Sequence, residues 1–325
     1  ASVRFKMAFD LDAFVMKYKV HEETVSFLKM SFEEGAKPYY ELSIEDARQA
    51  NLQTAKKYAG SVDFEGITKD FTVPSSNNID GIPITAYRAK TCNLTVVPPV
   101  MVYFHGGGNC MGSRQTYDTV CKVISRDAGC IVVSVEYRLA PEHKFPANHN
   151  DAKAAVHWTL MNKSLVGAAN NSKVGVGGDS SGGRIAGIVC HEVPELAFQV
   201  LVYPSVGFVK RYKSHEEFED GPILTKLTLD WCLDNYIDEN DRSNPRGNLM
   251  LQKSYSNLPP ALIIVAELDP LRDGCYAYHE KLKESGIKSQ VLTIKGAPHA
   301  FFHLHVPASA YLAREDREVP KVKEI

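Results

Sequence analysis

The sequence predicts an α/β protein with a mostly parallel central sheet that is covered by helices on both faces. Short apolar runs, such as residues 100–104 and 261–266, alternate with helical stretches over most of the 325 residues. Buried parallel strands joined by crossover helices have this pattern. A glycine-rich turn also follows the apolar run at 173–176 directly, as it does where a parallel strand leads into a helix.

Composition and charge exclude several other classes of protein. The chain has 37 Lys and Arg against 39 Asp and Glu, a formal net charge of −2, so it lacks the basic surface that nucleic acid or an anionic membrane requires. Its apolar runs are far shorter than the roughly 20 residues of a membrane helix. We therefore expect no nucleic-acid partner and no integral membrane span.

Cysteine usage and the first residues bear on the cellular compartment. The seven cysteines are odd in number, widely spaced and never arranged as C-x-x-C, which favours reduced, buried thiols over a disulfide framework. Residues 1–16 lack the basic-then-apolar order of a secretory signal, which favours a cytoplasmic protein. A signal peptide removed earlier would leave the same sequence. A homodimer is the one assembly that we consider.

The first 60 residues are expected to be helical. Leu11, Phe14, Val15 and Tyr18 recur at helical spacing, and Ser43 has the side chain and context of an N-cap for a helix that runs to residue 58. The pattern then changes to β-rich runs separated by Pro, Asn and Gly. The expected strands lie at 67–73, 82–88, 100–104, 130–136, 173–176, 199–203, 261–266 and 290–294.

Residues 205–247 interrupt the alternation and are interpreted as an insertion on the strand scaffold. We divide the chain into an N-terminal helical cap segment at 1–60, the first part of the catalytic α/β domain at 61–204, a cap insertion at 205–247, and the second part of the domain at 248–325. Aromatic side chains in the cap segments are candidates for a substrate-pocket wall, although ordinary helix packing would need the same pattern. They are Phe14, Tyr18, Phe208 and Trp231.

The strongest local signal is the pattern G-x-S-x-G at residues 178–182, directly after an expected strand. A sharp strand-to-helix turn exposes the central serine, and only small neighbours let the chain bend that closely. Ser180 is therefore the candidate nucleophile. Glycine-rich turns also bind phosphate, but Ser180 breaks the dinucleotide pattern that begins at Gly175, and no P-loop is present. We expect no cofactor.

A serine hydroxyl needs a base with a pKa near 7, normally a histidine oriented by a buried carboxylate. On strand scaffolds of this kind the partners follow in the order serine, acid, histidine. Asp269 follows the strand at 261–266, and His299 follows the strand at 290–294. These two residues are therefore the candidate acid and base.

Alternatives to both partners remain open from the sequence. Asp273 or Glu267 could supply the acid, since Asp269 could merely cap the next helix. His303 and His305 are the other candidate bases, although their segment favours surface or packing roles. Their H-x-H spacing also suggests a metal site, but no further Cys or carboxylate completes a ligand set, so we expect no metal.

Three consecutive glycines follow His105 at the end of the strand at 100–104. Attack on an acyl carbonyl places negative charge on its oxygen, and backbone N–H groups in a pocket stabilise that charge. Glycines leave such N–H groups accessible. We assign the backbone N–H groups of Gly107, Gly108 and Ser181 to an oxyanion hole.

With these motifs together, the chain resembles the hormone-sensitive-lipase family of α/β-hydrolases, which includes bacterial esterases and arylacetamide deacetylases. Five motifs occur in family order: His105-Gly-Gly-Gly, Tyr137-Arg-Leu-Ala-Pro-Glu with Phe145-Pro-Ala, Gly178-Asp-Ser-Ser-Gly-Gly, Asp269-Pro-Leu-Arg-Asp, and His299 shortly before an aromatic residue. The resemblance implies an α/β-hydrolase fold whose N-terminal helices and insertion form a cap. It also implies the same triad and oxyanion donors.

Three residues depart from the usual family pattern. Ser181 stands where alanine is frequent, Arg184 where asparagine is frequent, and Ala300 where glycine is common. None of these departures removes a catalytic group.

The expected activity is that of a serine carboxylesterase that hydrolyses short- to medium-chain acyl esters through an acyl-enzyme, with a small-molecule ester as its partner. The insertion at 205–247 is short for a lid that would open at a lipid surface. An amidase, a deacetylase or a lipase would use the same triad. A non-catalytic receptor, like the plant gibberellin receptors that resemble this family, lacks a working histidine, whereas His299 is present here.

Overall fold

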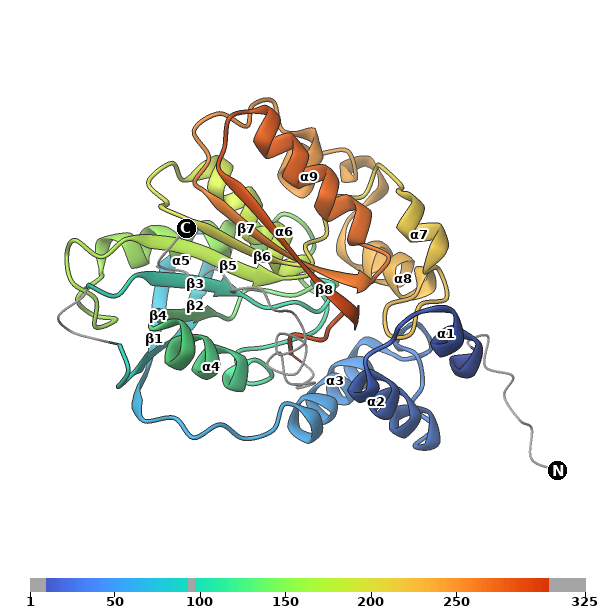
Figure 1. The fold of residues 1–325 in the computed structure, drawn as a ribbon. Helices are drawn as coiled ribbons and strands as arrows, with labels where there is room; N and C mark the ends of the chain where they lie inside the picture. Colours follow the sequence, from blue (N-terminus) through green and yellow to red (C-terminus); the bar gives the residue numbers. More distant parts are fainter. Residues whose placement is uncertain (1–9, 93–96, 304–325) are drawn as a thin grey trace.

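The computed structural model describes residues 10–92 and 97–303, and its strands form one eight-stranded sheet (Figure 1). The strands are β1 (Gly66–Ser75), β2 (Asn78–Ala89), β3 (Val100–Phe104), β4 (Ile131–Val135), β5 (Val174–Asp179), β6 (Gln199–Val202), β7 (Ala261–Leu268) and β8 (Ser289–Pro298). The helices are α1 (Leu11–Lys17), α2 (Glu22–Glu33), α3 (Ile44–Tyr58), α4 (Asp118–Ala128), α5 (Ala147–Met161), α6 (Ser181–Glu192), α7 (Lys213–Glu217), α8 (Lys226–Tyr236) and α9 (Arg272–Glu284), with short 3₁₀ turns at Tyr39–Glu41, Glu239–Asp241, Pro245–Gly247 and Leu249–Leu251.

Alternating side chains of the central strands enter separate cores on the two faces of the sheet. In β3, Val102 and Phe104 belong to the core that α5, α6 and α9 cover, whereas Met101 and Tyr103 belong to the core that α4 covers. This separation follows from the two-residue period of a strand. It confirms the expected arrangement of helices on both faces.

The strand order is β1-β2-β4-β3-β5-β6-β7-β8. β2 is antiparallel to β1 and β4, and every other pairing is parallel. The carboxyl ends of β3, β5, β7 and β8 therefore meet at one edge of the sheet. The loops after these four ends carry the candidate oxyanion glycines and the three candidate catalytic residues.

The expected strands are all present, but β5 is longer than its apolar run. Gly177 and Gly178 continue the parallel ladder opposite Tyr103 and Phe104 of β3. Because glycine has a low strand propensity, the sequence pattern predicted that the strand ends at residue 176, before these two glycines. The longer strand carries the chain to the point where the serine turn begins.

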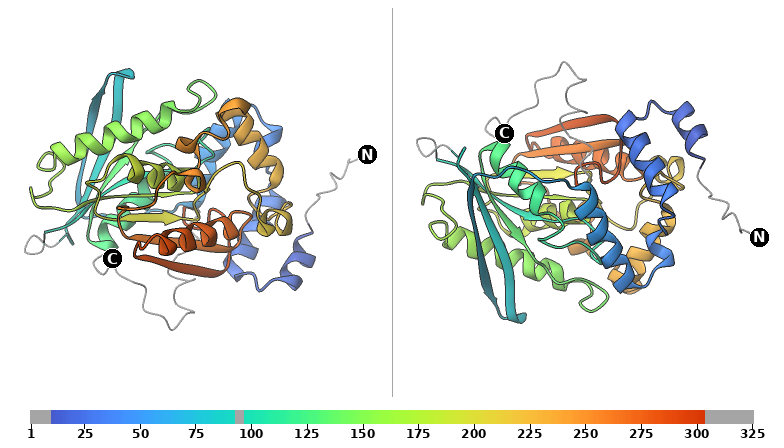
Figure 2. Two further views of the ribbon diagram at one scale, coloured as in Figure 1. Left: turned by 90° about the horizontal axis from the view of Figure 1, so that it is seen from above. Right: turned by 90° about the horizontal axis from the view of Figure 1, so that it is seen from below.

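The N-terminal helices and residues 205–247 lie at the same end of the molecule, as Figures 1 and 2 show. They share one apolar cluster in which Leu42 and Ala47 of the N-terminal segment pack with Trp231 and Tyr236 of α8. Two segments distant in sequence thus form one layer beside the sheet edge. The boundaries of the four predicted segments stay a prediction.

Two other expectations concern the cysteines and the membrane. Six of the seven cysteines are buried and Cys232 is partly exposed, which agrees with structural thiols. Among the described residues, no helix combines the length and apolar character needed to cross a membrane.

Candidate active site

Ser180 lies in a strained turn between β5 and α6. Its φ of 54° and ψ of −118° are unfavourable for an L-residue, so the surrounding structure must hold them. A Cβ atom at Gly178 or Gly182 would collide with the carbonyl oxygen of Phe104. The turn is also fixed by main-chain hydrogen bonds, because the Ser180 N–H donates to the Val202 carbonyl at 2.9 Å.

The structure brings Ser180, His299 and Asp269 into one line of hydrogen bonds. The Ser180 Oγ lies 3.0 Å from His299 Nε2, and His299 Nδ1 lies 2.7 Å from Asp269 Oδ2. Asp269 is fully buried and His299 is nearly so, whereas Ser180 is partly exposed. Because a carboxylate only accepts, Nδ1 carries the imidazole proton, and Nε2 is left to accept from the serine hydroxyl.

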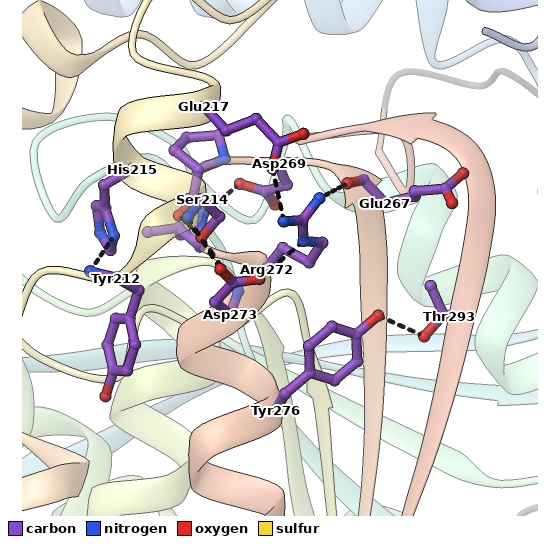
Figure 3. A network of polar contacts seen from close by, with 12 residues as sticks. Tyr212, Ser214, His215, Glu217, Glu267, Asp269, Arg272, Asp273, Tyr276 and Thr293 are labelled. Atoms are coloured by element: carbon purple, nitrogen blue, oxygen red, sulfur yellow. Dashed lines mark hydrogen bonds and ion pairs between the residues drawn. The ribbon is translucent and has the colours of Figure 1, made fainter. Parts of the chain in front are cut away.

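A second set of contacts holds the loop that carries Asp269 (Figure 3). The Leu271 N–H donates to Asp269 Oδ1 at 2.8 Å, which leaves Oδ2 for the imidazole. The Ser214 hydroxyl of α7 donates to the Pro270 carbonyl at 2.7 Å, and Arg272 Nη2 donates to Glu217 Oε2 at 2.8 Å. The shortest cap helix is thus tied to the acid loop.

The alternative acids have other partners. Asp273 accepts from the Ser214 N–H at 2.9 Å and from Arg272 Nε at 2.8 Å. Glu267 accepts from the Gly296 N–H at 2.7 Å and from Lys295 Nζ at 3.0 Å. Among the described residues, the carboxylate within hydrogen-bond distance of the His299 ring is that of Asp269.

Of the two alternative bases, the structure describes His303, and among the described contacts no hydrogen bond joins it to Ser180. His303 is partly buried, and its desolvation lowers its pKa to about 3, so it is a neutral packing residue. Its Nδ1 lies 3.9 Å from Asp179 Oδ2. His305 lies outside the described residues.

The glycine loop after β3 is shaped by close contacts. Gly107 and Gly108 have φ values of 115° and 63°, which favour glycine. A Cβ atom at Gly107 would collide with the Met111 carbonyl oxygen, and one at Gly108 with the Cys232 sulfur of α8. Among the hydrogen bonds of the described residues, the N–H groups of these two glycines have no acceptor.

Ser181, the third predicted oxyanion donor, is buried in the first turn of α6. Its hydroxyl accepts from the Asn109 N–H at 3.3 Å, which joins the nucleophile turn to the glycine loop. The three predicted donors therefore belong to two segments in direct contact. Backbone N–H groups at this helix start also favour negative charge.

Asp179 is a site residue that the sequence reasoning treated only as a variable motif position. Its carboxylate is fully buried and accepts from the Tyr103 hydroxyl at 2.9 Å, the Tyr117 hydroxyl at 2.8 Å and the Gly106 N–H at 2.9 Å. Burial raises the pKa of Asp179 to about 6, and the hydroxyl donors oppose that shift. An acidic residue at the end of an otherwise apolar strand was the available signal.

Ala300, one of the three departures from the family pattern, has a φ of 69°. This conformation costs an L-residue about 1 to 2 kcal/mol and explains why glycine is common at that position. The turn still places His299 against Asp269, so the departure is tolerated.

The four aromatic candidates for a pocket wall fall into two groups. The Phe14 ring lies 4.7 Å from the Tyr18 ring, which in turn lies 5.4 Å from Phe218 beside α7. Phe208 and Trp231 belong to the apolar cluster between the N-terminal segment and α8. The role of these residues as a pocket wall stays a prediction.

Comparisons with known proteins agree with this geometry. Residues 101–303 match a family model described as the alpha/beta hydrolase fold. The ethyl acetate hydrolase of Pseudomonas putida is 31% identical over 274 residues, which cover 82% of this chain and 86% of that protein. The carboxylesterase NlhH of Mycobacterium tuberculosis is 38% identical over 245 residues, 72% of this chain and 76% of the relative. The carboxylic ester hydrolase LipN of the same species is 36% identical over 69% of this chain, and this chain covers 61% of its length.

Solved structures show the same likeness. The hyperthermophilic esterase from the archaeon Pyrobaculum calidifontis superposes with a TM-score of 0.80 at 30% identity, covering 88% of this chain and 92% of that one. The ester hydrolase EH1AB1 from the metagenome of Lake Arreo, solved with a bipyridine phosphonate derivative, gives 0.82 at 30% identity, with 90% and 94% covered. This chain therefore belongs to the α/β-hydrolase fold family, in its hormone-sensitive-lipase-like branch, and is a carboxylic ester hydrolase.

Proposed function

We propose that this chain is a serine carboxylesterase in which Ser180, His299 and Asp269 hydrolyse short- to medium-chain acyl esters through an acyl-enzyme. The observation that carries the proposal is the continuous hydrogen-bonded line from the Ser180 hydroxyl through the His299 ring to the buried Asp269 carboxylate. Such a line supplies a base for the serine and a group that keeps the base in one tautomer.

In the first half of the reaction, the Ser180 oxygen attacks the ester carbonyl carbon while its proton moves to His299 Nε2. Asp269 stabilises the imidazolium that forms. The carbonyl oxygen gains negative charge and accepts hydrogen bonds from the proposed donors, each worth roughly 3 to 4 kcal/mol in comparable enzymes. The alcohol then leaves with the proton from His299.

In the second half, water attacks the acyl-serine and His299 accepts the water proton. Collapse of the second oxyanion releases the carboxylic acid and returns the proton to Ser180. Apart from the ester and one water molecule, each step uses only groups that the chain supplies.

The preference for short and medium acyl chains rests on the size of the cap. Within residues 205–247, α7 has 5 residues and α8 has 11, and α7 is bound to the acid loop through Ser214. A cap this small and this firmly tied leaves little surface to open at a lipid interface. An amidase or a lipase on the same triad is therefore the weaker alternative.

The test is a substrate series measured with the wild-type chain and with Ser180→Ala. We expect the wild type to hydrolyse 4-nitrophenyl acetate, butyrate and hexanoate faster than the decanoate. In Ser180→Ala, turnover should fall to background while the circular dichroism spectrum stays unchanged. Retained turnover in the variant would refute the nucleophile assignment, and a wild type that binds but never hydrolyses these esters would favour a receptor.

A second readout separates the enzyme classes. We expect the wild type to cleave 4-nitrophenyl acetate much faster than 4-nitroacetanilide, because an anilide transfers its acyl group to a serine less readily than an ester does. An equal or higher rate on the anilide would assign the site to amide hydrolysis. A preference for emulsified long-chain esters would assign it to lipids.

A further inference from the structure

Arg184 is a buried cation for which the described structure offers no carboxylate. The residue is 2% exposed and lies in the first turns of α6. Among the described residues, no acidic side chain forms an ion pair with it. An unpaired buried charge costs several kcal/mol, and a guanidinium cannot lose its proton to avoid that cost. The charge therefore needs an explanation.

The hydrogen bonds of this guanidinium leave one particular edge free. Its Nη1 donates to the Ser205 hydroxyl at 3.0 Å, whereas Nε and Nη2 have no hydrogen-bond partner. The N–H groups of Nε and Nη2 point in parallel and form the fork that binds both oxygens of a carboxylate. One nitrogen thus anchors the group, and the carboxylate-binding edge is unfilled.

Ser205 links the guanidinium to the main chain of the candidate nucleophile. The Arg184 N–H donates to the Ser180 carbonyl at 3.2 Å, and the Ser205 N–H donates to the same oxygen at 3.1 Å. The residue that anchors the guanidinium is therefore hydrogen-bonded to the nucleophile's own main chain. Arg184 is therefore connected to the candidate site and is not part of a remote surface.

Aromatic residues of the cap insertion cover the cation. The guanidinium carbon lies 4.3 Å from the centroid of the Phe208 ring and 5.4 Å from that of Tyr236. Burial lowers the pKa of Arg184, and the Tyr236 phenol opposes that shift. Ring faces attract the cation weakly but cannot accept the two parallel N–H groups. They cover the guanidinium without supplying a carboxylate.

A second buried polar side chain faces the same region. His149 of α5 is 1% exposed, and neither of its ring nitrogens has a hydrogen-bond partner. Burial and the Arg184 charge lower the pKa of His149, so the ring is neutral. The Phe145 ring lies 5.6 Å from His149 and 6.1 Å from Tyr236, which places the imidazole at the edge of the same aromatic group. Because His149 is neutral, one carboxylate would balance the charge of Arg184.

We propose that the Nε and Nη2 edge of Arg184 binds a carboxylate carried by the ester substrate. This inference rests on the proposed function and names its substrate class as esters with one additional acidic group. The carboxylate could belong to the acyl part, as in half-esters of dicarboxylic acids, or to the alcohol part. Asparagine, the residue frequent at this position in the family that the chain resembles, could not supply the charge.

The experiment compares charged and neutral esters in two arms. The acyl arm uses the 4-nitrophenyl half-esters of succinate, glutarate and adipate against 4-nitrophenyl butyrate, pentanoate and hexanoate. The alcohol arm uses the butyrate esters of 3- and 4-hydroxybenzoate against those of the corresponding methyl hydroxybenzoates. For each pair, the measured quantity is the ratio of kcat/KM for the charged ester to kcat/KM for the neutral ester.

We expect this ratio to fall by about 30-fold or more in Arg184→Gln for at least one pair, because a buried charge pair is lost. Arg184→Lys should retain part of the preference, since it keeps the charge without the fork. Arg126→Gln removes an exposed cation of α4 that pairs with Asp127, and it controls for net charge. An unchanged ratio in Arg184→Gln for every pair would overturn the proposal. The Nε and Nη2 edge would then be hydrogen-bonded to buried water.

The wild type alone provides a further test if the variants do not fold. The proposal requires that at least one charged ester be hydrolysed with a kcat/KM at least equal to that of its neutral counterpart. If every charged ester has a lower kcat/KM than its neutral counterpart, as a site without a cation would give, the proposal fails. In that case hydrolysis of the neutral esters would still support the proposed function, whereas no turnover of any ester would refute that function first.

Discussion

The sheet edge and the cap hold their residues in different ways. At the sheet edge, Ser180 and the glycine loop are fixed by main-chain hydrogen bonds and by contacts that leave no space for a Cβ atom. In the cap, buried contacts such as that of the Ser214 hydroxyl with the Pro270 carbonyl occur beside exposed side-chain pairs, such as Tyr18 with Glu217 and Lys144 with Asp238. Buried main-chain contacts fix positions far more rigidly than exposed ion pairs do.

Because of this difference, we expect the sheet edge to control the rate of the reaction and the cap to control substrate preference. The proposed reacting groups depend on the buried sheet edge, where a small displacement would be costly. The exposed pairs of the cap contribute little individually, so changing them should leave the proposed triad in place. Variants at the sheet edge should therefore affect kcat strongly, whereas variants in the cap should act weakly or through substrate preference.

The largest expected effect concerns the acid at the sheet edge. Asp269→Asn should lower kcat for 4-nitrophenyl butyrate by about 10⁴-fold, because an amide donates to Nδ1 and turns the imidazole into the wrong tautomer. Asp273→Asn is the matched control in the same loop, and we expect a much smaller loss. A larger loss in Asp273→Asn than in Asp269→Asn would make Asp273 the acid and break the comparison.

The next effect concerns the glycine loop. Gly108→Ala should lower kcat by about 10²- to 10³-fold, as losing one oxyanion donor does, because the methyl group would push the loop away from Cys232. Gly35→Ala is the control, since Gly35 has a similar φ of 67° but open space around its Cβ position. It should cost stability without affecting kcat. Wild-type kcat in Gly108→Ala would remove this loop from the oxyanion hole.

The third effect is on stability and depends on pH through Asp179. Its pKa is raised to about 6 from the ordinary 3.8, so the folded state binds this proton more tightly than the unfolded state. The free energy of unfolding should therefore decrease as the pH rises from about 4 to about 6, by about 3 kcal/mol from this group. Acidification through the same range should restore it.

Urea unfolding at pH 4.5 and 7 of the wild type and Asp179→Asn measures this dependence. Relative to the variant, which has no carboxyl to titrate, the wild type should lose stability as the pH rises. A difference between the two proteins that stays constant with pH would show that Asp179 does not titrate in this range. It would also indicate that the carboxylate is better solvated than its burial implies.

The smallest effect is expected in the cap. The Tyr18 hydroxyl donates to Glu217 at 3.2 Å in an exposed contact, so Tyr18→Phe should change the free energy of unfolding by about 1 kcal/mol or less. We expect kcat/KM for 4-nitrophenyl butyrate to change by less than about threefold. Tyr18→Ala also removes the ring contacts with Phe14 and Phe218 and should have the larger effect. A large loss of kcat in Tyr18→Phe would mean that the cap positions the triad.

Local patterns predicted much of the fold and the main candidates of the site. Strand runs and helical spacing depend on periods of two and 3.6 residues, which are visible in any short window of sequence. Ser180 and the glycine loop became candidates for the same reason, because the small residues that a tight turn requires are adjacent in the chain. The length of β5 was underestimated, since pairing with β3 rather than local propensity keeps Gly177 and Gly178 in the strand.

The assignment among Asp269, Asp273 and Glu267 shows where sequence reasoning stops. All three carboxylates lie within seven residues, and their order relative to Ser180 and His299 is the same. Which of them meets the imidazole depends on how the loop folds against Ser214 and Leu271. That packing involves residues more than fifty positions away, so no local pattern could determine it.

By itself, the sequence determined the alternating α/β architecture, the serine turn and the set of residues able to form a triad, because these depend on residue types and short spacings. Only the tertiary structure decided which carboxylate faces His299, that Asp179 anchors the glycine loop, and that the carboxylate-binding edge of Arg184 is left without a partner. These facts depend on which distant groups approach a given atom once water is excluded. Burial and hydrogen bonding between distant segments are properties of the folded chain.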